Sequence, residues 1–262
     1  MNITDIQKDV RYWQLLLRLA GYYAGKTDGI VGPLTRAGEA RWIEAAAAAR
    51  EKYGTFDERS EANISTLLPK AQEIARRWLK AARVRAAELG VEVRIIDGNR
   101  SYAEQDRLYA KRPKVTNARG GQSWHNFGLA FDFGVFRGAS YLGDSPHYKT
   151  LGSIATAIPG TTWGGTWAKL VDEPHIQLNL FPTISAARKL GAATPAWVKR
   201  HRGEGRILVR KSDESCSVTL ANAVPYGQFL LKLRAQFALG GVRRGLEGNI
   251  RAMKRKILRS LK

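Results

Sequence analysis

The sequence is poor in the residues that most often build covalent cross-links and metal clusters. It contains one cysteine, Cys216, and four histidines in 262 residues. A single cysteine excludes an internal disulfide and any metal site held by several cysteines, so a metal would need histidine and carboxylate ligands. This composition suits a protein made in a reducing cytoplasm. No run of about 18 apolar residues is present, which excludes a hydrophobic membrane span.

Acidic residues are also scarce. The chain has 23 Asp and Glu against 43 Lys and Arg, which gives a net charge of +20. Such an excess attracts polyanions, among them nucleic acid, teichoic acids, lipopolysaccharide and anionic lipid. Residues 191–262 hold sixteen Lys or Arg and only four acidic residues, so most of the excess lies there. Charge alone does not choose among these partners.

The length allows one sizeable core and a small accessory domain. In residues 1–48, apolar residues at helical spacing run from Val10 to Ala20. Gly21 and Gly25 are typical of helix ends and turns, and Pro33 suits the first turn of a second helix that continues to Trp42. We therefore predict a small all-α unit.

The order of motifs in this unit is Gly-Tyr-Tyr, Asp-Gly-Ile and Gly-Pro-x-Thr between two helices. It resembles the peptidoglycan-binding domain found at the ends of many cell-wall hydrolases. The resemblance implies a wall-binding role, for which the candidate residues are Tyr22, Tyr23 and Asp28.

The next segments predict an α+β domain. Polar residues 49–63 are the expected linker, and residues 64–190 form the expected catalytic domain. Helical spacing predicts helices over residues 64–89, 102–108 and 151–157, and alternation predicts strands over residues 91–96, 129–133 and 175–180. We expect a small antiparallel sheet with flanking helices that holds a metal site.

Three separated segments carry residues suited to zinc hydrolysis: residues 97–101, 123–132 and 172–175. Catalytic zinc is usually held by three His, Asp or Glu ligands with one position left open. His125, Asp132 and His175 would supply those ligands. In a strand, Asp132 points away from the face that carries Phe131 and Phe133.

Hydrolysis also needs a base and a positive charge near the substrate. Asp172 and Glu173 are both candidates for the base. We favour Asp172, because Pro174 biases Glu173 toward an extended conformation without a clear route to the metal. Arg100 could bind a substrate carboxylate or the developing oxyanion.

Together these motifs resemble the zinc D-alanyl-D-alanine carboxypeptidases and L-alanyl-D-glutamate endopeptidases, most closely the endopeptidase branch that includes many phage endolysins. The matching residues are Ser123, His125, Gly128, Ala130, Asp132, Trp163, Gly164, Gly165, Trp167, Asp172 and His175, with Gly98, Arg100, Ser101 and Gln105 upstream. The resemblance implies Zn²⁺ on His125, Asp132 and His175, Asp172 as general base, and Arg100 and Ser123 at the substrate.

Other positions of this pattern are candidates for substrate binding or depart from the family. Gln105, Trp163 and Trp167 are candidate substrate-binding residues, although either tryptophan could instead belong to the core. Asp172 stands where many relatives have Glu, and Asn99 stands where Tyr is expected. The shorter acid keeps Glu173 open as the alternative base.

The basic segment, residues 191–262, has no recognised family. Leu246, Ile250, Met253, Ile257 and Leu261 fall on one helical face among basic residues. Such a helix could lie on an anionic membrane, lipopolysaccharide or wall polymer, or pack on the body with a solvated basic face. We expect no specific nucleic-acid binding, because no basic platform with interleaved aromatic residues is present.

The leading hypothesis is a monomeric peptidoglycan hydrolase that cleaves the L-alanyl-D-glutamate bond of the stem peptide. The alternatives are a D-alanyl-D-alanine carboxypeptidase, a non-catalytic wall-binding or virion structural protein, and a polyanion-binding protein. Because no secretory signal is visible at the N-terminus, we expect synthesis in the host cytoplasm and action at the bacterial wall or periplasm after release.

Overall fold

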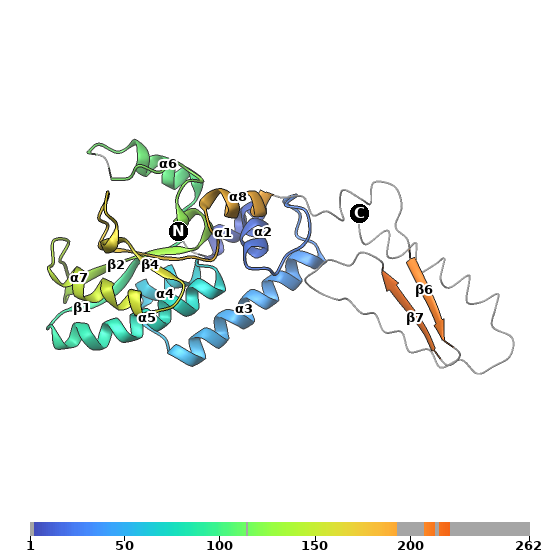
Figure 1. Ribbon diagram of the computed structural model, residues 1–262, viewed down its shortest axis with the longest axis horizontal. Coiled ribbons are helices and arrows are strands. Elements are labelled where there is room, and N and C mark those ends of the chain that lie inside the picture. Colours follow the sequence, from blue (N-terminus) through green and yellow to red (C-terminus); the bar gives the residue numbers. More distant parts are fainter. Residues whose placement is uncertain (1–2, 114, 193–206, 213–214, 221–262) are drawn as a thin grey trace. The chain divides into compact units, whose positions relative to one another are not determined.

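The structure is a computed structural model that describes residues 3–113, 115–192, 207–212 and 215–220. The chain divides into two compact units, residues 1–200 and 201–262. The first unit carries the helices and the main sheet drawn in Figure 1. Among the described residues, no helix has the length and apolar character needed to cross a membrane.

The first unit begins with helices α1 (Ile3–Lys8), α2 (Val10–Leu19) and α3 (Pro33–Tyr53). Asp9 caps α2, and Pro33 occupies the first turn of α3, where a missing N–H costs nothing. Trp13 and Trp42 pack edge to face between these helices with ring centroids 4.7 Å apart. The two predicted helices are therefore confirmed, although α3 is longer than expected.

The segment predicted to be a linker, residues 49–63, is mostly helical. Its first residues complete α3, and α4 (Glu58–Ser65) follows with Asp57 as its cap. The single helix predicted over residues 64–89 was wrong at its start, because α5 (Pro69–Glu88) begins separately. Pro69 holds Leu68 in an extended conformation, which keeps α4 and α5 apart.

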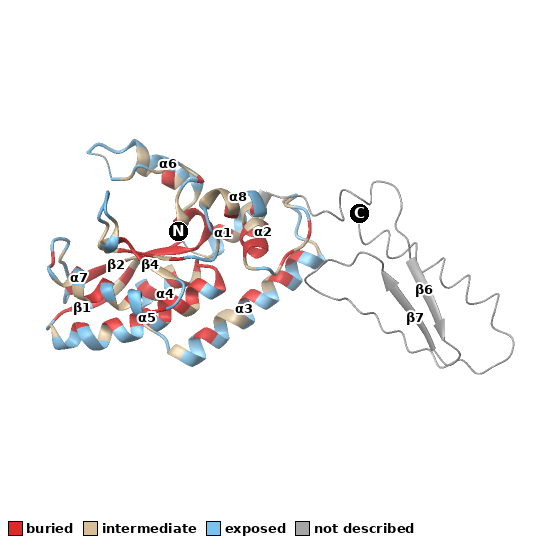
Figure 2. Cartoon of the chain, viewed as in Figure 1, coloured by how far each residue is buried: buried red, intermediate tan, exposed pale blue. Residues whose placement is uncertain are grey.

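The main sheet is antiparallel, as predicted. It has the order β1 (Glu92–Asp97), β2 (Ala130–Arg137), β5 (His175–Leu178) and β4 (Thr161–Trp163), and β3 (Ser140–Tyr141) pairs with β2. Helix α5 lies along the sheet in Figure 1, and its Trp78 contacts Phe131 and Phe133. Figure 2 shows that burial is concentrated in β2 and on one side of α5. The α+β prediction is confirmed.

Shorter elements complete this unit: α6 (Tyr102–Ala110), α7 (His147–Gly152) and α8 (Ile184–Ala192), with the 3-10 helices η1 (Trp124–Phe127), η2 (Ser153–Ala157) and η3 (Gly164–Thr166). The helix predicted at residues 151–157 is the end of α7 together with η2. Helix α8 contacts both α2 and η1.

The second unit contains an antiparallel hairpin of β6 (Ile207–Ser212) and β7 (Ser215–Leu220). Its register runs from Ile207 opposite Leu220 to Ser212 opposite Ser215. Cys216 lies on β7. The amphipathic helix predicted around residues 246–261 lies outside the described residues, so its anionic partners stay a prediction.

Candidate metal centre and active site

Strand pairing brings two of the predicted ligands together. Asp132 on β2 stands opposite His175 on β5, and on its other side Asp132 pairs with Asp97 of β1. The neighbours Phe131 and Phe133 are buried in the core on the other face of β2. The alternation predicted from the sequence therefore directs Asp132 to the site.

His125 reaches the same place from η1. The Ser123 hydroxyl and the Asn126 side chain form a capping box at the start of this short helix. Gly128 ends it with a φ of 62°, a left-handed conformation that glycine adopts without strain. A Cβ on Gly128 would lie 3.0 Å from the backbone nitrogen of Leu68, so only glycine allows this close turn.

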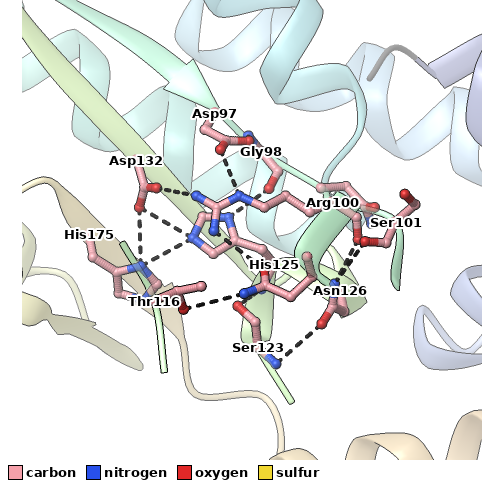
Figure 3. Close-up of polar contacts among 12 residues, drawn as sticks. Asp97, Gly98, Arg100, Ser101, Thr116, Ser123, His125, Asn126, Asp132 and His175 are labelled. Atoms are coloured by element: carbon pink, nitrogen blue, oxygen red, sulfur yellow. Dashed lines mark hydrogen bonds and ion pairs between the residues drawn. The ribbon is translucent and has the colours of Figure 1, made fainter. Parts of the chain in front are cut away.

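The three side chains form a compact triangle of donor atoms (Figure 3). His125 Nε2 lies 3.2 Å from His175 Nδ1 and 3.2 Å from Asp132 Oδ1, and His175 Nδ1 lies 3.1 Å from Asp132 Oδ1. A tetrahedral zinc site with bonds of about 2.0–2.1 Å has ligand atoms roughly 3.3 Å apart. The two imidazoles and the carboxylate therefore fit a tetrahedral zinc ion, with one position left for another ligand.

The outer nitrogen of each imidazole has its own acceptor. His125 Nδ1 lies 2.7 Å from the carbonyl oxygen of Gly98, and His175 Nε2 lies 3.2 Å from Gln177 Oε1. With its hydrogen on that outer nitrogen, each ring turns an unprotonated nitrogen toward Asp132. Converging lone pairs of this kind are suited to a bound cation.

Arg100 orients Asp132, the third candidate ligand. Its Nη2 donates to Asp132 Oδ2 at 2.6 Å and its Nε to Asp97 Oδ2 at 2.7 Å. Gln105, which is fully buried, accepts from Arg100 Nη1 at 3.5 Å and donates to the carbonyl oxygen of Ala118. The described contacts of Arg100 and Gln105 are thus with the site and its supporting loop, and their substrate-binding role stays a prediction.

The electrostatics of the site follow from this pairing. Burial by itself would raise the pKa of Asp132, but His125 and His175 hold that pKa well below its usual range. Burial would lower the pKa of His175, yet the Asp132 carboxylate raises it overall. Asp132 is therefore a charged ligand at neutral pH.

Asp172 and Glu173 differ in their surroundings. Burial, and then repulsion from Asp132, raises the pKa of Asp172, which also interacts electrostatically with both histidines. Glu173 instead lies 3.9 Å from Lys149 Nζ, and its carbonyl accepts from Trp163 Nε1 at 2.7 Å. Asp172 therefore interacts with the charged groups of the site, and the described ion pair of Glu173 is with Lys149.

The two tryptophans play different parts. Trp163 is 8% exposed and packs with the core, while its indole N–H fixes the turn before His175. Trp167 is half-buried, and its ring centroid lies 5.1 Å from that of His175. Trp167 therefore lies beside the candidate metal-binding residue His175, and Trp163 holds the turn that precedes it. Substrate contact by either ring, or by the capping residue Ser123, stays a prediction.

The candidate wall-binding residues have internal contacts. The Tyr23 hydroxyl donates to the carbonyl oxygen of Lys26, and Asp28 Oδ1 accepts from Gln14 Nε2 and from the backbone N–H of Ile30. Tyr22 is half-buried against the core. Their role in wall binding stays a prediction.

Four residues of the site were not assigned a role from the sequence: Asp97, Asn126, Gln177 and Tyr12. The first three lie next to motif residues, and Gln177 shares a strand face with His175. Tyr12 belongs to α2, and its hydroxyl reaches Asn99 and the backbone of Asn126. No sequence pattern links a helix so distant in the chain to the site.

The sequence of this part of the chain agrees with a known family. Residues 116–178, which include all three proposed ligands, match the model of the D-alanyl-D-alanine carboxypeptidase family of M15 peptidases. This stretch of the chain is therefore similar to the peptidases of that family. Members of that family are metallopeptidases, and the triangle of His125, Asp132 and His175 in this chain could hold a metal ion.

Two known proteins are similar to this part of the chain. The chain is 39% identical over 115 residues to the peptidoglycan L-alanyl-D-glutamate endopeptidase CwlK of Bacillus subtilis (strain 168), a match of 38% of this chain and 66% of that protein. The chain thus spans slightly less than two thirds of this relative. The L-Ala D-Glu endopeptidase ChiX of Serratia marcescens matches 47% of this chain and 88% of its own at 23% identity. The TM-score of this match is 0.38.

Proposed function

We propose that this protein is a zinc endopeptidase that hydrolyses the L-alanyl-D-glutamate bond in the stem peptide of bacterial peptidoglycan. The observation that carries the proposal is the triangle of His125 Nε2, Asp132 Oδ1 and His175 Nδ1, with sides of 3.1–3.2 Å. The M15 match covers these residues, and the similarity to CwlK supports the choice of substrate.

Zinc is the metal that best suits two imidazoles and one carboxylate with an open fourth position. When bound, zinc acts as a Lewis acid that polarises the scissile carbonyl and lowers the pKa of water. His125, Asp132 and His175 would hold it. Their outer contacts with Gly98, Arg100 and Gln177 orient the three side chains before a substrate arrives.

Asp172 is the proposed general base and acid. Its carboxylate takes a proton from the attacking water and returns it to the nitrogen of the leaving amine. Its raised pKa, caused first by burial, makes this carboxylate a better proton acceptor than an exposed aspartate. Glu173 is the weaker candidate because its carboxylate lies beside Lys149.

Residues around the triangle support these steps. Arg100 orients Asp132 through the contact between Nη2 and Oδ2. The ring of Trp167 packs beside that of His175, which is buried. Gly164 accepts a hydrogen bond from the backbone N–H of Asp172, and a Cβ there would lie 2.3 Å from the carbonyl oxygen of Asp172. The close turn of η3 therefore fixes the position of the Asp172 backbone.

A second candidate is removal of a terminal D-alanine from the same stem peptide. The description of the matching family favours it, because that family is named for D-alanyl-D-alanine carboxypeptidases. The two reactions share the metal and the base and differ in which bond is cleaved. In both cases we propose that the protein acts at the bacterial wall.

The test is digestion of purified peptidoglycan by the wild type and by His175→Ala, with the new ends identified by mass spectrometry. The proposal expects new N-terminal D-glutamate ends with the wild type and none with the variant. Release of free D-alanine would instead assign the carboxypeptidase reaction. No product from a zinc-loaded wild type would refute both.

A further inference from the structure

The N-terminal helices contact the candidate active site through one hydroxyl group. Tyr12, on α2, places its Oη 2.6 Å from Asn99 Oδ1 and 2.8 Å from the carbonyl oxygen of Asn126, with the carbonyl oxygen of Arg100 at 3.4 Å. Burial raises the pKa of this hydroxyl far above its ordinary value, so it stays a hydrogen-bond donor at every physiological pH.

The partners of Tyr12 belong to the two segments that hold His125. Asn99 follows Gly98, whose carbonyl oxygen accepts from His125 Nδ1, and Asn126 follows His125 directly. The same two segments are joined by hydrogen bonds from Arg100 N to the carbonyl oxygen of His125 at 3.1 Å and from Asn126 Nδ2 to that of Arg100 at 2.9 Å. Tyr12 therefore lies where the loop after β1 meets η1.

A hydroxyl has one hydrogen, so Tyr12 can donate fully to only one acceptor at a time. Asn99 Nδ2 is buried and has no hydrogen-bond partner in this arrangement. If the Asn99 amide turns over, its NH2 donates to Tyr12 Oη and the Tyr12 hydrogen goes to the carbonyl oxygen of Asn126. In either arrangement Tyr12 satisfies a polar group that is closed to water.

Packing holds the helix that carries Tyr12. The Tyr12 ring meets Tyr102 edge to face with centroids 6.0 Å apart, and Tyr102 meets Phe127 of η1 in the same way at 6.2 Å. Farther along α2, Arg18 Nη1 donates to the carbonyl oxygen of Gly191 in α8 at 3.2 Å. Because α8 also contacts η1, α2 is attached to the site from two directions.

From this geometry we propose that Tyr12 is a positioning residue of the metal centre, which connects the candidate wall-binding unit to that centre through a single side chain. Tyr12 acts through Asn99 and Asn126 on His125, and it touches neither metal nor substrate. The activity part of this inference rests on the proposed function. The metal-binding part does not, since it concerns only the geometry of His125.

The experiment compares full-length Tyr12→Phe with the wild type and two controls. Tyr53→Phe removes a hydroxyl from α3 whose described hydrogen bond is with Glu73 Oε1, at 3.5 Å, and not with the loops around His125. Leu15→Ala weakens the packing of α2 near Gly191 and leaves the Tyr12 hydroxyl in place. For each protein we would measure the melting temperature, zinc affinity by competition with a chelator, and kcat and KM on a soluble stem peptide.

Changes in groups that orient metal ligands typically cost 10–100-fold in metal affinity or activity, and Tyr12 acts one contact further out, so we expect losses of about tenfold. Tyr12→Phe should lower zinc affinity and kcat by that factor and leave KM within about twofold. Leu15→Ala should lower the melting temperature while zinc affinity and kcat stay at the wild-type values. Tyr53→Phe should match the wild type throughout.

Two results would overturn the inference. One is a Tyr12→Phe variant with wild-type zinc affinity and kcat. The other is a Leu15→Ala variant whose zinc affinity and kcat fall as far as those of Tyr12→Phe, because Tyr12 would then contribute only to the stability of the fold. If the wild type binds zinc but cleaves no stem peptide, the proposed function fails and zinc affinity alone still decides the role of Tyr12. A wild type that binds no zinc would refute both.

Discussion

Arg100 and Asp132 form a largely buried ion pair, with Nη2 2.6 Å from Oδ2, and this contact leaves Oδ1 of Asp132 facing both imidazoles. Only 13% of the Arg100 side chain is exposed. The guanidinium thus neutralises one oxygen of the carboxylate, and the other is available to a metal ion. Asp97 holds the guanidinium in turn through Nε.

Replacing Arg100 should therefore weaken the metal site. We expect Arg100→Met to raise the zinc dissociation constant by about 10–100-fold, because Asp132 loses the group that orients it. Chelator competition would measure this change. Arg94→Met is the matched control: Arg94 lies on β1, shortly before Arg100 in the chain, and pairs with the exposed Glu92. Equal zinc affinities in both variants would contradict the positioning role of Arg100.

The choice of base can be tested with two isosteric changes. Asp172→Asn should lower kcat by about 10²–10⁴-fold, the usual contribution of general acid–base catalysis, and should leave bound zinc unchanged. Glu173→Gln should keep kcat within about twofold, because Glu173 faces Lys149. Steady-state kinetics on a soluble stem peptide would measure both. The assignment is reversed if Glu173→Gln is the inactive variant.

Gln177 should matter through His175. Its Oε1 lies 3.2 Å from His175 Nε2 and fixes which ring nitrogen carries the hydrogen. We expect Gln177→Leu to weaken zinc binding about tenfold, with a small change in melting temperature. Gln177 Nε2 donates to Asn179 Oδ1, and Asn179 Nδ2 donates in turn to the Thr162 hydroxyl. Thr162→Val removes this more distant hydroxyl and should leave zinc affinity unchanged. Unchanged zinc affinity in Gln177→Leu would mean that packing alone orients His175.

Glu61 provides a pH-dependent stability that is separate from catalysis. It binds the fully buried Arg76 through both oxygens at 2.6–2.7 Å. Burial would raise the pKa of Glu61, but hydrogen bonds from Arg76 and from the Phe56 N–H lower it overall. A lowered folded-state pKa means stability that is present above the unfolded pKa and lost as the pH falls through the folded one.

Glu61→Gln should therefore be less stable than the wild type at pH 7, by about 2 kcal/mol, and the difference should shrink in acid as the wild-type carboxylate becomes protonated. Urea unfolding at several pH values would measure it. Glu88→Gln, whose ion pair with Arg85 is about half exposed, should match the wild type. A stability difference that does not change with pH would contradict the role given to the Glu61 charge.

The sequence predicted the centre of the site well because local patterns determine it. Alternation along β2 predicted that Asp132 lies on the strand face opposite that of Phe131 and Phe133, and Gly128 indicated the turn that brings His125 back over the strand. These features depend on a few neighbouring residues, so they are readable without a structure. The same holds for the antiparallel strands that carry Asp132 and His175.

What the sequence did not predict depends on contacts between distant segments. The pairing of Arg100 with Asp132 requires the register of β1 against β2, and the Tyr12 contact requires the docking of α2 on the loop after β1. Helix α4 was read as a linker because most of its residues are polar, and its buried Ser60 and Ile64 are too few to form a strong helical pattern.

The measurement that tests the central claim most directly is zinc content and stem-peptide cleavage in one preparation of the wild-type protein, before and after a chelator and after zinc is added back. We predict one zinc ion per chain, loss of L-alanyl-D-glutamate cleavage when it is removed, and recovery when it returns; His125→Ala should bind no zinc and cleave nothing. Full cleavage by protein stripped of metal would contradict the account.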